Sequence, residues 1–126
     1  MTTKIVNLTP HPVRIRLEDG STYSSYPAGL ARVSSTSVAL GALEIESPHG
    51  DKIMRVPVFA THFGTVEGLP DPVEGTIYVT SALVAEAATR AGRTDVFAPG
   101  TGPNDGAIRD ESQRVEAVTR LVRVGG

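Results

Sequence analysis

The sequence predicts a mainly β fold of the α+β class, as a small antiparallel sandwich or partly open barrel with one short helix. Short apolar runs rich in β-branched residues recur between turn signals along most of the 126 residues. Only the stretch 82–91 combines helical spacing with signals for both a helix start and a helix end. At this length one hydrophobic core suffices, so we expect a single domain over 1–126.

The N-terminal half of the chain is expected to form hairpins. Apolar and polar residues alternate on both sides of Pro10 and Pro12, which indicates a bent strand or a pair of strands. Turn-forming residues at 18–21 and 47–51 mark two reversals of the chain. Prolines make 68–72 a loop or an edge crossing. The predicted strands are, in order, 4–17 with its kink, 21–26, 30–33, the two arms of a hairpin over 38–59, and 63–67.

A single helix is expected in the C-terminal half. Residues 75–80 form the clearest strand of the chain, and Ser81 directly after it can accept a hydrogen bond from a first-turn amide of the helix 82–91. Gly92 can take the left-handed conformation that ends the helix. The predicted buried stripe consists of Leu83, Val84, Ala87, Ala88 and Ala91.

The sequence after the helix predicts a loop, a short strand and a C-terminal segment of less certain type. Glycine and proline make 94–105 the segment that we expect to be most mobile. Residues 107–109 follow as a short strand. The apolar spacing of 115–124 fits either a helical stripe or an imperfect strand. Its β-branched content favours a strand.

Composition narrows the classes of function. A formal charge of −2 without a basic tract lacks the electrostatic footprint of a nucleic-acid-binding protein. No apolar run has the length of a membrane span, and no secretory signal pattern opens the chain, so we expect a cytoplasmic protein. Cysteine is absent, and the three histidines are far apart in sequence. We therefore expect neither a metal nor a cofactor.

Two groups of residues are candidates for a ligand site. Asn7 and His11 lie in a proline-containing kink that could aim the imidazole into a pocket; alternatively, Asn7 only satisfies backbone groups freed by the prolines. Ser81 opens the helix, where free amides and the helix dipole favour an anion. If the second group converged at the helix start, it would supply a ring that stacks on a base, an amide that reads a base edge and two guanidinium groups that bind phosphate. This group consists of Phe97, Asn104, Arg109 and Arg32. Alternatively, Phe97 belongs to the core and Arg109 forms a surface ion pair with Asp110.

Several motifs resemble small proteins encoded by bacteriophages, prophages and actinobacteria. Among phage proteins of this size the chain resembles the anti-defence sponges that inhibit Thoeris immunity, in length and in its β-rich N-terminal part. The resemblance implies that it binds a cyclic ADP-ribose signal and holds it without cleaving it. The motifs are KIVNLTPHPV at 4–13, PAGLARV at 27–33, VEGLP at 66–70, EGTIYVTSALVA at 74–85 and IRD at 108–110.

Three hypotheses of function follow. The first is a non-catalytic protein that sequesters a nucleotide-derived immune signal, with a small nucleotide as its ligand. The second is a virion structural protein, either a capsid decoration or a head-completion protein, because the chain is small and has many short strands. In both we expect a homo-oligomer, since strand edges need covering. The third is an enzyme that uses His11 with an Asp or Glu, but the spacing shows no nucleophile–base pair, and we expect no catalysis.

Overall fold

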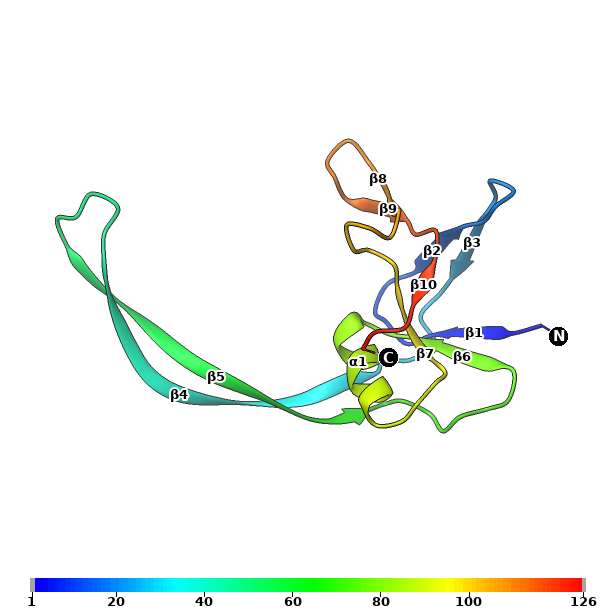
Figure 1. Ribbon diagram of the computed structural model, residues 1–126, viewed down its shortest axis with the longest axis horizontal. Helices are drawn as coiled ribbons and strands as arrows, with labels where there is room; N and C mark the ends of the chain where they lie inside the picture. The colour runs from blue at the N-terminus through cyan, green and yellow to red at the C-terminus, as the bar shows by residue number, and fades with distance from the viewer. Residues whose placement is uncertain (1, 126) are drawn as a thin grey trace. The chain divides into compact units, whose positions relative to one another are not determined.

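The computed structural model describes residues 2–125, and these form ten strands and one helix (Figure 1). The mainly β class with a single helix is therefore confirmed. The backbone divides into two compact units, one of Met1–Val33 with Val66–Gly126 and one of Ser34–Thr65. The elements are β1 (Lys4–Asn7), β2 (Val13–Arg16), β3 (Thr22–Ser25), β4 (Arg32–Glu46), β5 (Ile53–Glu67), β6 (Thr76–Val79), α1 (Ala82–Arg90), β7 (Val96–Pro99), β8 (Ile108–Arg109), β9 (Val115–Ala117) and β10 (Leu121–Val122).

The main sheet of the first unit has the order β1-β6-β7-β10. β1, β6 and β7 are parallel, and only β10 is antiparallel to its neighbour. This differs from the antiparallel sandwich or barrel that the sequence predicts, because α1 connects β6 to β7 as a crossover. The other strands form separate two-stranded sheets, and the described residues contain no closed barrel.

The core of the first unit lies on both faces of the main sheet. On one face, Ala85 and Ala88 of α1 pack against Val96 and Ala98 of β7. On the other face, the fully buried Val79 of β6 packs with Val13 and Ile15 of β2 and with Val118, directly after β9. The small alanines allow the helix to approach the sheet closely. The layers are therefore helix, mixed sheet and hairpin.

The helix begins and ends where the sequence predicts. Ser81 has an extended backbone, and its hydroxyl accepts a hydrogen bond of 3.3 Å from the amide of Val84. Gly92 has a φ of +96°, and the amide of Arg93 donates to the carbonyl of Ala88, which closes the last turn. The buried stripe differs from the prediction in part: Ala85 is buried, whereas Leu83 is 45% exposed and Ala91 is exposed as well.

The C-terminal segment 115–124 is extended, as its β-branched content predicts. β9 pairs with β8 and β10 pairs with β7. Val118 joins β2 through two backbone hydrogen bonds, because Arg16 donates to its carbonyl at 2.7 Å and its amide donates to Arg14 at 2.8 Å. The segment thus links the β2–β3 hairpin to the β8–β9 hairpin.

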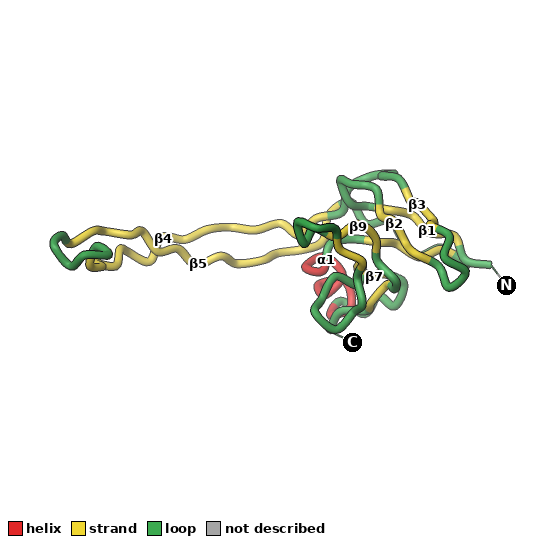
Figure 2. The backbone as a smooth tube through the Cα atoms, turned by 90° about the horizontal axis from the view of Figure 1, so that it is seen from above, coloured by secondary structure: helices red, strands yellow, loops and turns green. Residues whose placement is uncertain are grey.

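The second unit is part of the hairpin of β4 and β5 (Figure 2). Its turn lies at 47–51 as predicted, with the amide of Ser47 donating to the carbonyl of Lys52. Each strand has fifteen residues, so the predicted short strand at 63–67 is the end of β5. Within residues 2–125 no helix has both the length and the apolar character needed to span a membrane.

An ion pair fixes the connection between α1 and β7. The guanidinium of Arg93 donates two hydrogen bonds of 2.9 Å to the carboxylate of Asp95 and a third to the carbonyl of Pro70. Both side chains are mostly buried. The hydrogen bonds from Arg93 lower the pKa of Asp95 below its ordinary value of 3.8.

The ion pair predicts how stability depends on pH. Because the folded-state pKa of Asp95 lies below the unfolded one, the ionised carboxylate stabilises the fold above about pH 4, and this contribution is lost as the pH falls through the folded value. Asp95→Asn should lower the free energy of unfolding by about 2 kcal/mol near neutral pH. Near pH 2 it should have little effect.

Urea denaturation of both proteins across this pH range measures the difference. Glu111→Gln, in the exposed turn between β8 and β9, is the control and should behave as the unmodified protein does. A destabilisation by Asp95→Asn that is equal near pH 2 and near pH 7 would contradict the role of the ionised pair.

Candidate functional site

A cavity of about 440 Å³ lies beyond the carboxyl ends of the parallel strands β1, β6 and β7. The segment after β1 contributes Thr9, His11 and Pro12, the segment after β6 contributes Thr80 and Ser81, and the end of β7 contributes Ala98 and Pro99 with Thr101 beyond it. Ligands of open α/β sheets bind in the crevice outside these strand ends. The position of the cavity therefore matches the usual binding edge of a parallel sheet. Val13, Ala82 and Val115 complete the lining.

The wall after β1 is held by one buried amide. The side chain of Asn7 is fully buried, and its nitrogen donates to the carbonyls of His11 at 2.8 Å and Ser25 at 2.9 Å. Its oxygen accepts hydrogen bonds from both the amide and the hydroxyl of Thr9. Because Pro10 and Pro12 have no amide to donate, these bonds fix the turn in place of a backbone ladder. The local sequence Asn-Leu-Thr-Pro-His-Pro thus sets one side of the cavity.

Ser81 and Ala82 at the start of α1 line the cavity. The first-turn amides of a helix have no hydrogen-bond acceptor within the helix. Of these amides, the hydroxyl of Ser81 accepts a hydrogen bond from that of Val84. The amides of Ala82 and Leu83 precede it in the same turn. Together with the positive end of the helix dipole, these groups favour a negatively charged or strongly accepting ligand group.

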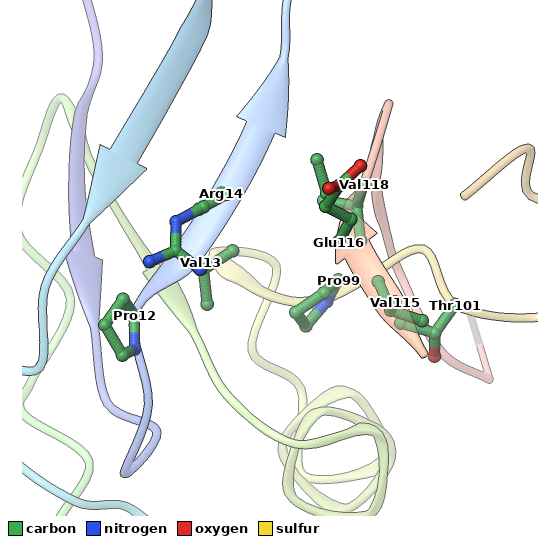
Figure 3. A pocket seen from close by; sticks show the side chains of 9 residues that line it. Pro12, Val13, Arg14, Pro99, Thr101, Val115, Glu116 and Val118 are labelled. Atoms are coloured by element: carbon green, nitrogen blue, oxygen red, sulfur yellow. The ribbon is translucent and has the colours of Figure 1, made fainter. Parts of the chain in front are cut away.

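A smaller pocket of about 130 Å³ adjoins the cavity and shares Pro12, Val13, Pro99, Thr101 and Val115 with it. Figure 3 shows Pro12 and Val13 on one side and Pro99 and Val115 on the other. This pocket adds two charged residues to the lining, Arg14 from β2 and Glu116 from β9. The two spaces together give a mostly apolar site with hydroxyls, one imidazole, one guanidinium and one carboxylate.

The structure brings two of the predicted site residues to the cavity. His11 and Ser81 line it, and both side chains are exposed. Asn7 does not line it but holds the backbone of His11, as described above. Of the two interpretations of Asn7, its hydrogen bonds agree with the second, in which its side chain satisfies backbone groups beside the prolines.

The other four predicted residues do not line the cavity. Arg109 donates to the carbonyls of Gln113 and Thr101, so it holds the chain beside one wall. Phe97 lies on β7, where its ring is 5.4 Å from the guanidinium carbon of Arg123. Two are exposed at other places in the chain, Asn104 in the loop after β7 and Arg32 at the first residue of β4.

The loop 100–106 is tied to its neighbours. The amide of Gly100 donates to the carbonyl of Arg120, and that of Gly102 donates to the carboxylate of Asp105 at 2.9 Å. Thr119 donates from its hydroxyl to the carbonyl of Asp105. These hydrogen bonds hold Thr101 at the cavity. They lie in the segment that the sequence predicts to be the most mobile.

Sequence reasoning did not find Thr9, Thr101, Arg14 or Val115 as lining residues. Because β1, β6 and β7 are parallel, the segments that follow them lie at the same edge of the sheet. Thr9 follows β1 and Thr101 follows β7, so the strand directions are the signal that identifies both residues. Arg14 and Val115 arrive through the contact of β2 with β9, which no local pattern predicts. Within residues 2–125 no group of three or more acidic, histidine or cysteine side chains could hold a metal ion.

Comparison with known proteins assigns no class to this fold and site. No family model matches the sequence, and neither a curated protein nor a solved structure shows significant similarity to it.

The role of Asn7 predicts a large effect on stability. Asn7→Ala leaves two carbonyls and the Thr9 amide without their partner in a buried setting, so it should lower the free energy of unfolding by about 3 kcal/mol. Asn104→Ala makes the same chemical change at an exposed site and should alter it by less than about 0.5 kcal/mol. Chemical denaturation of the two variants gives both values, and equal values would refute the anchoring role.

Proposed function

We propose that this chain is a non-catalytic binding protein that sequesters a nucleotide-derived signal of the cyclic ADP-ribose type in the cavity at the carboxyl ends of β1, β6 and β7. The observation that carries the proposal is the position of this cavity, about 440 Å³ in volume, at the start of the only helix in residues 2–125. Small-molecule sites are commonly mostly apolar clefts with a few placed polar groups.

The lining suits the parts of such a ligand. A phosphate is favoured at the first-turn amides of α1 and at the hydroxyl of Ser81. The adjoining pocket adds one positive side chain, Arg14, and one negative side chain, Glu116. The apolar walls formed by Pro12, Pro99 and Val115 offer flat contact to a base or ribose.

Retention rather than turnover is the simplest use of these groups. Ser81, the one serine of the cavity, caps the helix with its hydroxyl, and Thr80 donates its hydroxyl to the carbonyl of Ser81. Both are therefore engaged in structure. Holding a ligand requires complementary contacts and no bond-breaking groups.

Filling the cavity tests the proposal. A cyclic ADP-ribose isomer in large excess should raise the melting temperature of the unmodified protein, because a ligand that binds only the folded state stabilises it. Ala82→Phe places a ring in the cavity and should reduce this shift to less than about one fifth, since the steric block removes the binding contacts. Differential scanning fluorimetry measures the shift.

Ala42→Phe, the same substitution on β4, is the matched control and should keep the full shift. His11→Ala and Arg14→Ala should each weaken binding without lowering the melting temperature of the unliganded protein, because both side chains are exposed. No stabilisation by any member of a panel of cyclic nucleotides, or an undiminished shift in Ala82→Phe, would reject the proposal. Mass spectrometry of released ligand should find it unchanged.

A second candidate function is a structural component of a virion. The observation that favours it is the β4–β5 hairpin, which exposes a large part of the chain's apolar side chains. It predicts that the protein is present in purified phage particles at a fixed ratio to the capsid protein. Quantitative mass spectrometry of particles tests this, and its absence from them would remove this candidate.

A further inference from the structure

The pocket that adjoins the cavity carries two opposite charges on separate walls. Arg14 belongs to β2 on one side of the pocket, and Glu116 belongs to β9 on the other side (Figure 3). Both residues are exposed, and neither forms an ion pair within residues 2–125. The guanidinium and the carboxylate are therefore both available to a ligand.

The opposite charges indicate a ligand group without net charge. A phosphate that approached Arg14 would also approach Glu116, whose carboxylate repels an anion. The two side chains together favour a group that offers an acceptor to the guanidinium and a donor to the carboxylate. A phosphate is better placed at the start of α1, because no acidic residue lines the larger cavity there.

The walls and the size of the pocket fit one planar ring. Pro12 and Val13 lie on one side of it, and Pro99 and Val115 lie on the other, so its walls are mostly apolar. Its volume is about 130 Å³. A cavity of roughly 150 Å³ holds benzene, so the pocket has room for a ring and not for a whole nucleotide. Because these four residues also line the larger cavity, the rest of a ligand can lie there.

A purine with an amino group at position 6 offers the two required groups on one edge. In adenine the 6-amino group donates hydrogen bonds and the neighbouring N7 accepts them. In a 6-oxopurine both O6 and N7 are acceptors. Such a base would suit Arg14, but it would place an oxygen against the carboxylate of Glu116. Glu116 is therefore the residue that can distinguish the two classes of base.

We propose that the pocket between β2 and β9 is the base subsite of the ligand site, and that Glu116 makes it select 6-aminopurines over 6-oxopurines. The inference rests on the proposed function, because it takes the ligand to be a nucleotide with a phosphate at the start of α1. The 6-amino group donates to Glu116, and N7 accepts from Arg14. Backbone hydrogen bonds of Val118 with Arg14 and Arg16 hold the two walls together before a ligand arrives.

A change of base and a change of residue test the selectivity together. Isothermal titration calorimetry compares a cyclic ADP-ribose isomer with the analogue in which hypoxanthine replaces adenine. The unmodified protein should bind the adenine ligand about 10-fold more tightly or better, because O6 of hypoxanthine faces the carboxylate of Glu116. Glu116→Gln keeps the size of the side chain, and its amide can donate to O6, so the preference should fall below about 3-fold.

Glu111→Gln is the matched control, because it makes the same change in the exposed turn between β8 and β9. This variant should keep the full preference for adenine. Equal binding of the two ligands by the unmodified protein, or an unchanged preference in Glu116→Gln, would overturn the base subsite and leave the proposed function standing. If neither ligand binds the unmodified protein, both the subsite and the proposed function are wrong.

A second measurement does not depend on any change at Glu116. The 7-deaza form of the adenine ligand has a carbon in place of N7, so it offers no acceptor to Arg14. It should bind the unmodified protein about 10-fold more weakly than the parent ligand. Arg14→Ala should bind the two ligands equally, because the contact is already lost. An equal loss in both proteins would contradict the contact between Arg14 and the base.

Discussion

The buried side-chain amide of Asn7 is the interaction on which the described site depends. It stands at the end of β1, and its bonds to Thr9, His11 and Ser25 hold together the proline turn and the end of β3. The backbone carbonyl of Asn7 also accepts the amide of Ala28 at 2.8 Å. Since the prolines cannot donate to a ladder, this one residue determines where the turn lies relative to the sheet.

The parallel arrangement of β1, β6 and β7 turns this local anchor into a site. Each strand delivers its following segment to the same edge, and α1 starts there because β6 leads directly into its cap at Ser81. The small residues Ala85, Ala88 and Ala98 let the helix lie close to β7. Polar groups of the helix start therefore meet apolar residues of β7 and β9 in one cavity.

Local sequence patterns predict the individual helices, strands and turns, whereas the arrangement of the strands in sheets depends on long-range pairing. The cap at Ser81, the end at Gly92 and the turns of the hairpins follow from residue chemistry within a few positions. The parallel pairing of Ile5 with Ile77 joins distant segments and leaves no local trace. For the site, the kink at Asn7 and the helix start were identifiable. Arg32, Phe97, Asn104 and Arg109 were grouped by chemical type, and residue type does not determine which side of a sheet a side chain reaches.

The most direct test of the account is a backbone amide NMR titration of the full chain with a cyclic ADP-ribose isomer. If the cavity holds the ligand, the amides of Thr9, His11, Leu83 and Thr101 should show the largest chemical-shift changes, and those of the β4–β5 hairpin between Ser34 and Thr65 should stay unchanged. Shifts confined to the hairpin, or none at saturating ligand, would contradict a binding site at the carboxyl edge of the parallel strands.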